Sequence, residues 1–262
     1  LLYNENQKTV KKETLMKYSE LKAIMIEMFD ESKLEMFPQE WGFYNEIDRD
    51  IKCIGYATNL TQEIIEKASR EDVDFLITHH DSWEFIYGLK ECCNDLLDSG
   101  RITHAYFHAP LDDAEFGTSA SLAKALGIKN LKKVMPYAEV YYGGVAGDSD
   151  PVSFELFTKR LEEILQEKVR SYQNHKKPVK KAAVAAGGGN MTNEMRIAAE
   201  AGCDTYVTGE YVLYSQQYAQ HVGMNLLVGS HTNTEILGVE SLVRRITKGT
   251  DIRLVRIKEP NY

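Results

Sequence analysis

The chain has 262 residues, of which 43% are hydrophobic and 27% are charged, and its formal net charge is −8 at pH 7. This length suits one large or two modest domains with proper cores, and the composition excludes a disordered or low-complexity chain. The acidic balance argues against broad nucleic-acid binding driven by charge, because phosphate backbones recruit basic surfaces.

Neither a membrane segment nor a secretory leader is expected. No stretch approaches the roughly 20 apolar residues that span a bilayer, and residues 1–8 lack the apolar core of a secretory signal. Cys53, Cys92, Cys93 and Cys203 form no Cys-x-x-Cys pair, and the adjacent Cys92 and Cys93 are poorly placed for a mutual disulfide. The simplest account of these four cysteines is that they are reduced thiols in a cytoplasmic protein.

Strand-like apolar runs alternate with helical patterns in the first half of the chain. Strands are expected at 53–57, 73–77 and 102–107, and helices at about 61–70, 89–97 and 119–126. In the first of these helices Ile64, Ile65 and Ala68 recur at helical spacing, and Thr61 has the character of an N-cap. Gly127 closes the last one.

The second half opens with a β-rich stretch at 134–145, after a soft domain boundary near 129–130. Asp150 and Pro151 have the pattern of an N-cap followed by proline at the first helical position, which predicts a helix to about Leu165. Further strands are expected at 182–186, 205–207, 225–228 and 252–257, and further helices at about 192–201, 214–221 and 234–246. This alternation predicts an α/β fold with mostly parallel sheets.

Candidate ligand groups lie just beyond three of the predicted strands. They are His79 and His80 after the strand at 73–77, His108 and Asp112 after the strand at 102–107, and His231 and Glu235 after the strand at 225–228. Open α/β sheets hold their ligands beyond the carboxyl ends of the strands, so these loops are expected to meet. For any one of these residues, a surface or capping side chain is the alternative.

The spacing of these residues indicates how they would share metal ions. His231 and Glu235 are four positions apart and would lie on one helix face. Adjacent side chains in extended backbone point opposite ways, so His79 and His80 are expected to bind different ions, with a carboxylate bridging the two. Two such ions polarise an electrophile and activate water. Imidazole and carboxylate ligands suit Zn, Fe, Mn, Co or Ni.

Other features leave two interpretations open. The string 187–190, Gly-Gly-Gly-Asn, could hold a phosphate or form a tight strand-to-helix turn. Glu210, just past the strand at 205–207, could be a carboxylate that supports a metal ligand, a general base facing the cleft, or a capping residue. The basic run from Lys176 to Lys181 is typical of a solvated loop, although it could line a nucleic-acid clamp.

An aromatic segment follows the histidine pair. Trp83, Phe85 and Tyr87 could line a substrate pocket or pack beneath their own loop.

Four motifs occur in the order seen in one protein family. They are Thr78-His79-His80, His108-Ala109-Pro110-Leu111-Asp112, Tyr206-Val207-Thr208-Gly209-Glu210 and His231-Thr232-Asn233-Thr234-Glu235. The chain thereby resembles the interacting-factor-three-like dinuclear metal-centre family, often labelled GTP cyclohydrolase I type 2 homologues. The resemblance covers roughly Trp41 to the C-terminus.

The resemblance implies a set of ligands for two divalent ions. It places His80 and Asp112 on one ion, His79 and His231 on the other, and Glu235 between them as a bridge. His108 matches a family histidine near the metals, which is expected to support the ligands or to serve as an occasional ligand itself. The family's common pattern has proline or glycine after the histidine pair, whereas this chain has Asp81, which adds a further carboxylate.

The resemblance also implies an architecture and an assembly. The family fold has two layered α/β domains with the metals in the cleft between them, and its members form homohexameric rings. The last helix and strand are expected to pack back onto the first domain. The domains would comprise residues 1–128 plus 231–262, and residues 129–230.

The function expected from these features is that of a metal-dependent hydrolase resembling GTP cyclohydrolase I type 2, acting on a small molecule such as a nucleotide. Catalytic roles are expected for Glu235, His108 and Glu210, with His108, Glu210 or Asp81 moving protons. Phosphoester hydrolysis would use the same metals. A non-enzymatic, metal-binding regulatory ring is the alternative outside enzymology, and nucleic acid is not an expected partner.

Overall fold

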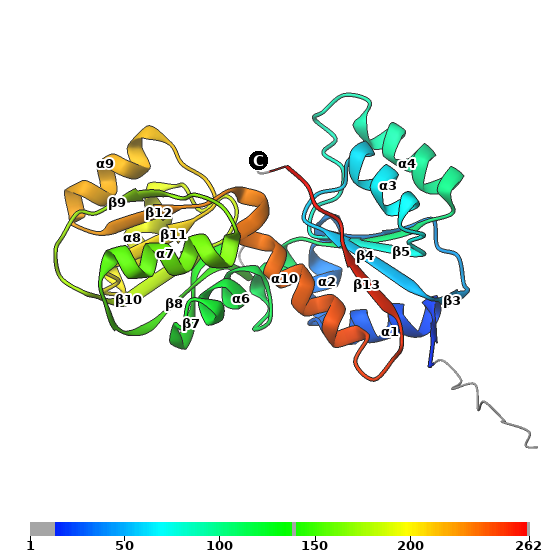
Figure 1. Cartoon of the computed structure of the whole chain (residues 1–262), viewed down its shortest axis with the longest axis horizontal. Helices are drawn as coiled ribbons and strands as arrows, with labels where there is room; N and C mark the ends of the chain where they lie inside the picture. Colours follow the sequence, from blue (N-terminus) through cyan, green and yellow to red (C-terminus); the bar gives the residue numbers. More distant parts are fainter. Residues whose placement is uncertain (1–13, 138–139, 261–262) are drawn as a thin grey trace, which may run out of the picture.

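The computed structural model describes residues 14–137 and 140–260. Residues 1–8, where no secretory signal is expected, lie outside the described part. Two β-sheets with flanking helices lie side by side, and helix α10 (His231–Ile246) runs between them (Figure 1). Among residues 14–137 and 140–260, no helix is long and apolar enough to cross a membrane.

The first sheet has five strands in the order β13-β4-β5-β6-β2. The strands are β2 (Trp41–Tyr44), β4 (Cys53–Ala57), β5 (Phe75–Thr78), β6 (Thr103–Phe107) and β13 (Arg253–Arg256). All neighbours are parallel except β2 and β6. The chain's last strand, β13, thus pairs with β4, and the expected parallel arrangement holds in this sheet.

Helices and a small ribbon surround the first sheet. The helices are α1 (Tyr18–Glu27), α2 (Glu31–Met36), the 3-10 helix η1 (Pro38–Glu40), α3 (Gln62–Arg70), α4 (Leu89–Gly100) and α5 (Ala109–Asp113). The ribbon pairs β1 (Met16–Lys17) with β3 (Asp50–Ile51). Thr61 caps α3 as expected, because its side chain accepts from the backbone N–H of Ile64.

The second sheet has six strands in the order β7-β8-β10-β11-β12-β9. Its strands are β7 (Lys129–Tyr137), β8 (Tyr141–Val152), β9 (Arg170–Tyr172), β10 (Val179–Ala185), β11 (Thr205–Thr208) and β12 (Asn225–Val228). Its helices are α6 (Thr118–Ala125), α7 (Phe154–Leu165), α8 (Thr192–Glu200) and α9 (Leu213–Val222).

The expectation of mostly parallel strands needs correction in the second sheet. Only β10, β11 and β12 run parallel, whereas β7, β8 and β9 pair antiparallel with their neighbours. For β7 and β8 the reason is connectivity, because they follow one another too closely for the crossover that parallel strands require.

The predicted helix start at Asp150 and Pro151 is also wrong. Strand β8 continues through both residues to Val152, and Pro151 lies where the register between β8 and β10 shifts, a position that tolerates a missing N–H. Ser153 is the true N-cap of α7, with its Oγ accepting from the Leu156 N–H at 3.2 Å. The helix ends at Leu165, as expected.

Helix α10 joins the two halves of the molecule through its side chains. Its buried residues Ile236, Val239 and Leu242 belong to the core beneath the first sheet. Leu237, one position from Ile236, packs against the core of the second sheet. The start of α10 is therefore held from both sides, which fixes the direction of any side chain in its first turn.

Gly238 allows α10 to approach the start of α6, and this contact supplies a test of the packing. A Cβ added at Gly238 would lie 2.5 Å from the backbone nitrogen of Thr118. Alanine is the better helix former by about 1 kcal/mol, but overpacking against backbone costs about 1–3 kcal/mol. We therefore expect Gly238→Ala to lower the free energy of unfolding in urea by up to about 2 kcal/mol.

Gly100→Ala is the matched control for that substitution. A Cβ at Gly100, the last residue of α4, would meet only Ile102 Cδ1 at 3.4 Å, which is ordinary contact. This variant should be as stable as the parent protein or slightly more so. Equal stability of the two variants would contradict the close approach of α10 to α6.

Candidate metal centre

The histidine pair is buried at the carboxyl end of β5. His79 is fully buried and His80 is 2% exposed, and the backbone N–H groups of both donate to Thr58 O at 3.0 and 2.9 Å. The His79 Nδ1–H donates to Phe107 O at 2.9 Å, and the His80 Nδ1–H donates to Asn59 Oδ1 at 2.9 Å. Each ring therefore directs its Nε2 into the cluster, and this is the atom that binds a metal when it carries no proton.

His231 and Glu235 lie in the first two turns of α10, on one face as their spacing predicts. Ser230 caps the helix by accepting from the Asn233 N–H at 3.2 Å. The His231 Nδ1–H donates to Glu210 Oε1 at 2.7 Å, and His231 Nε2 lies 3.2 Å from Glu235 Oε2. This imidazole also uses Nδ1 for an orienting contact and turns Nε2 to the cluster.

Asp112 brings a second carboxylate from α5, the short helix that follows β6. Its Oδ1 lies 3.4 Å from His79 Nε2 and accepts a hydrogen bond from the Thr118 hydroxyl at the start of α6. The three candidate loops therefore meet at one point, as the positions beyond the strands predict.

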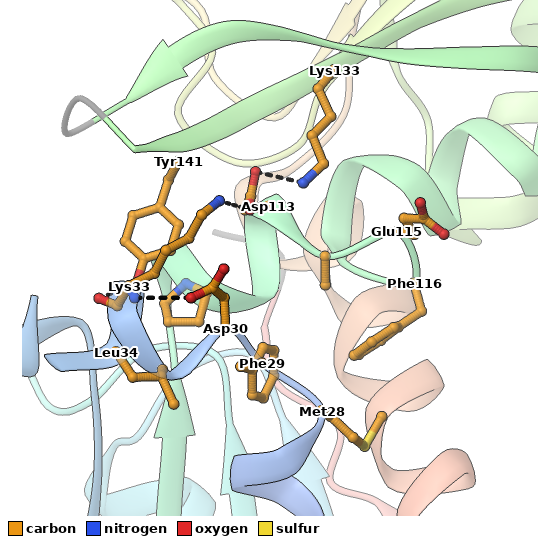
Figure 2. A pocket seen from close by; sticks show the side chains of 12 residues that line it. Met28, Phe29, Asp30, Lys33, Leu34, Asp113, Glu115, Phe116, Lys133 and Tyr141 are labelled. Carbon is orange, nitrogen blue, oxygen red and sulfur yellow. Dashed lines mark hydrogen bonds and ion pairs between the residues drawn. The ribbon is translucent and has the colours of Figure 1, made fainter. Parts of the chain in front are cut away.

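The neighbouring Asp113 ties α5 to both halves of the molecule. Figure 2 shows its carboxylate between Lys33 of α2 and Lys133 of β7, whose Nζ atoms lie 2.6 and 2.8 Å from its oxygens. The same residues line a separate cavity of about 290 Å³. The helix that carries Asp112 is thus held from the side facing away from the cluster.

Glu235 is common to two sets of ligand atoms. In each set, one ligand atom from each residue lies within 4.8 Å of the others. One set comprises His79, Asp112 and Glu235, and the other comprises His80, His231 and Glu235. The two oxygens face different imidazoles, with Oε1 3.5 Å from His79 Nε2 and Oε2 3.6 Å from His80 Nε2.

These sets group the ligands differently from the family resemblance, which implied His80 with Asp112 and His79 with His231. The reason is the order of strands, because β5 lies between β4 and β6. The His79 ring turns toward the end of β6, where Asp112 follows, and the His80 ring turns toward Asn59 at the end of β4.

Two buried atoms in the cluster lack hydrogen-bond partners. They are His79 Nε2 and Glu235 Oε2. Buried polar atoms are rarely left unpaired, since each costs about 1–3 kcal/mol. Neutral imidazole and carboxylate are a donor set that divalent transition metals prefer. These residues could therefore hold a metal ion.

The charges of the cluster are strongly coupled. Burial disfavours the imidazolium of His79, but Asp112 and Glu235 outweigh it and raise its pKa to about 9. Burial likewise opposes charge on His231, but the nearby carboxylates of Glu210 and Glu235 outweigh it and raise its pKa to about 10. Burial dominates at His80 and holds its pKa well below the usual value. When no cation is bound, protons on His79 and His231 balance the negative charge of the carboxylates.

His108 stands beside the cluster, with its ring 5.0 and 5.1 Å from the rings of His79 and His80. Its Nδ1–H donates to Glu40 Oε2 at 2.6 Å. No motif indicated Glu40, which lies in η1 and far from any of the motifs. Asn59, the partner of His80, was missed for the same reason.

Gly187 is required by the cluster itself. Its φ is +67°, and a Cβ there would lie 1.9 Å from Glu235 Oε1. Its N–H donates to Thr234 Oγ1 at 2.9 Å, so this amide of the Gly-Gly-Gly-Asn string is engaged in the turn between β10 and α8.

A cavity of about 180 Å³ opens beside the cluster. Its lining includes His80, His108, Asp112, His231 and Glu235, together with Trp83, Met135, Tyr137 and Glu194. The Trp83 ring lies 4.7 Å from the His80 ring.

A neighbouring groove continues from the cavity along the loop after β5. Trp83, Phe85 and Asp81 line this groove, whereas Tyr87 is 98% exposed and lines neither space. Asp81 Oδ2 lies 3.3 Å from Lys90 Nζ, so its carboxylate pairs with a lysine of the groove.

The basic run from Lys176 to Lys181 leads into β10 at the end opposite the cluster. The backbone N–H groups of Lys180 and Lys181 both donate to Asp204, and Lys181 Nζ donates to Ala201 O. These contacts hold the start of β10 in place at the end of the sheet away from the cluster.

Comparison with known proteins gives consistent matches over nearly the whole chain. Residues 16–261 match the sequence model of the family described as Duf34/NIF3 (NGG1p interacting factor 3). A GTP cyclohydrolase 1 type 2 homolog of Pyrococcus horikoshii is 28% identical over 226 residues, covering 84% of this chain and 89% of that protein. The homolog of the same name from Escherichia coli is 26% identical over 253 residues, covering 94% and 99%.

The fold is also similar to that of solved structures. Reduced HcgD from Methanocaldococcus jannaschii superposes with a TM-score of 0.79 at 22% identity, covering 95% of this chain and 100% of that chain. At this identity the match establishes a common fold.

The raised pKa values predict that metal uptake releases protons. At pH 7.5 His79 and His231, with pKa values of about 9 and 10, are protonated before uptake, and a ligand imidazole must be neutral. We expect on the order of two protons released per chain at pH 7.5. Titration calorimetry in buffers of different ionisation enthalpy measures this number.

The direction of the pH dependence follows from the same values. Proton release should diminish as pH rises through the two pKa values, and the apparent affinity for Zn²⁺ should increase over that range. His231→Gln should release about one proton fewer than the parent protein. Uptake without proton release at pH 7.5 would contradict the protonated state of the cluster.

Proposed function

We propose, since the chain belongs to the Duf34/NIF3 family, that it is a metal-dependent hydrolase with two divalent ions at the cluster around Glu235. Membership confirms the resemblance indicated by the four sequence motifs. The proposal rests on one observation: His79, His80, Asp112 and His231 surround the carboxylate of Glu235. Two buried atoms of this cluster, His79 Nε2 and Glu235 Oε2, have no hydrogen-bond partner.

The number of protein ligands supports catalysis over a purely structural site. Each of the two sets that contain Glu235 offers three protein atoms. Structural zinc sites are closed by four protein ligands, whereas catalytic sites keep a position for water or substrate. Four of the five proposed ligands line the cavity of about 180 Å³, which gives a small molecule access to that position.

When bound, divalent cations at this place supply Lewis-acid polarisation of a substrate oxygen and lower the pKa of water. Glu40 holds the Nδ1–H of His108, so His108 Nε2 is the atom that accepts or donates a proton beside the cluster. Glu210 contacts His231 Nδ1. We therefore assign Glu210 a positioning role, which is one of the alternatives that its place after the strand at 205–207 left open.

The substrate class follows from the relatives' names and remains part of the proposal. Several are called GTP cyclohydrolase 1 type 2 homologs, which suggests hydrolytic attack on a ring carbon of a purine nucleotide. Trp83 and Tyr137 offer aromatic surfaces in the cavity on which a planar ring can stack.

The proposal includes a homohexameric ring located in the cytoplasm, as the family resemblance implies. The exposed apolar residues Phe85, Ile86 and Tyr87 favour association between copies. The cysteines of the described residues are all free, which suits a reducing compartment.

Glu235→Ala tests the proposed function most simply. The parent protein should contain two metal ions per chain and hydrolyse GTP, whereas the variant should lose both ions and at least about 100-fold in turnover. Metal analysis of the purified protein and product chromatography measure the two effects, with a phosphoester assayed in parallel.

Glu240→Ala is the matched control, because Glu240 lies farther along α10 and pairs with Arg244 at 2.7 Å. It should keep both ions and full turnover. A metal-loaded parent protein that turns over neither GTP nor the phosphoester would refute the hydrolase, as would a Glu235→Ala variant of undiminished activity.

A further inference from the structure

The C-terminal segment reaches back to the candidate metal centre through one carboxylate. Beyond β13, the Ile257 N–H donates to Tyr56 O at 2.9 Å, and Lys67 Nζ donates to Lys258 O at 2.8 Å. Figure 1 shows the last strand, β13, beside β4. The contacts beyond β13 bring the chain to the loop that follows β4, which Glu259 contacts.

Glu259 accepts three hydrogen bonds from two consecutive residues of that loop. Its Oε1 accepts from the Thr58 N–H at 2.6 Å, and its Oε2 accepts from the Asn59 N–H at 3.3 Å and from Asn59 Nδ2 at 3.0 Å. Glu259 is about 200 residues distant in sequence from both, so the contact depends on the complete first sheet.

The bond to Asn59 Nδ2 determines which way the Asn59 amide faces. Because the NH₂ group is directed to Glu259, the amide oxygen is directed to His80 Nδ1, at 2.9 Å. An oxygen at that position requires a proton on Nδ1, which leaves the lone pair on Nε2. The tautomer of His80 is therefore set through Asn59 by a residue from the end of the chain.

The same loop also holds both histidine-bearing segments. Thr58 O accepts from the backbone N–H groups of His79 and His80, while Thr58 Oγ1 donates to the backbone oxygen of Thr232 at 2.9 Å. Thr232 follows His231 at the start of α10. Movement of the Thr58–Asn59 loop would thus disturb ligands on two elements.

We propose that Glu259 is a positioning residue for the metal centre, fixing the Thr58–Asn59 loop and, through the Asn59 amide, the ligand tautomer of His80. The inference rests on the proposed function only in taking His80 as a metal ligand. It does not require that the protein catalyse a reaction.

Glu259→Gln is the sharpest variant, because glutamine keeps the shape but replaces one accepting oxygen by an NH₂ group. That group would face donors, so the Asn59 NH₂ group would lose its acceptor at residue 259 and keep only Thr232 Oγ1, at 3.3 Å. In metal-free protein labelled with ¹⁵N-histidine, we expect the His80 ring to be the Nδ1–H tautomer at pH 8. The variant should show a mixture of tautomers, with the His80 signal identified by its loss in His80→Gln.

Metal affinity provides the second readout. Competition with a chromophoric chelator should show that Glu259→Gln binds one of its two Zn²⁺ ions about tenfold more weakly, because partners that orient a ligand contribute about 10–100-fold. The ion held with His79 and Asp112 should be less affected. Asn59→Ala interrupts the same chain at its middle and should reproduce the effect if the first variant folds poorly.

Glu71→Gln is the matched control. Glu71 pairs with Arg253 of β13 at 3.3 Å, so it supports docking of the same C-terminal strand but makes no contact with the Thr58–Asn59 loop. It should leave the His80 tautomer and both affinities unchanged.

The outcomes distinguish this inference from the proposed function. An unchanged His80 tautomer and unchanged Zn²⁺ affinity in both Glu259→Gln and Asn59→Ala would overturn the positioning role. Loss of one Zn²⁺ affinity in a protein that hydrolyses neither GTP nor a phosphoester would uphold that role while refuting the hydrolase.

Discussion

The structure depends on one buried carboxylate whose hydrogen-bonding capacity the neighbouring residues do not fully satisfy. Glu235 is 3% exposed and lies between the imidazoles of His79 and His80, yet its Oε2 has no hydrogen-bond donor. A buried charge of this kind must be compensated by protons or by cations. Elements from both sheets converge on it, so compensation of this one charge couples the ends of β5, α5 and α10.

The orientation of the three ligand histidines links the fold to this chemistry. His79, His80 and His231 all use Nδ1 for a contact with the surrounding protein, and each has a different acceptor: a backbone carbonyl, an amide and a carboxylate. The three Nε2 atoms are thus aimed inward before any cation arrives. Such preorganisation reduces the cost of binding and makes the three imidazoles unequal as electron donors.

Sequence reasoning predicted the meeting of the loops but not the details of their contact. His79, Asp112 and His231 each follow a strand, and the carboxyl ends of these strands lie close together. The motifs and the predicted strands were sufficient to indicate this. The grouping of ligands depended on strand order in space, which chain order does not contain. Glu40, Asn59 and Glu259 were invisible because a single carboxylate or amide in a loop has no periodic pattern. The helix expected at Asp150 failed because sheet pairing overrode a local capping signal.

The most direct test of the account is a crystal structure of the protein loaded with Zn²⁺, with the ions located by their anomalous scattering. The account predicts two peaks in each chain, roughly 3.5–4 Å apart, one beside His79 and Asp112 and the other beside His80 and His231. The Glu235 carboxylate should lie between them. A single ion that contacts neither Glu235 oxygen, or peaks only at surface residues, would contradict it.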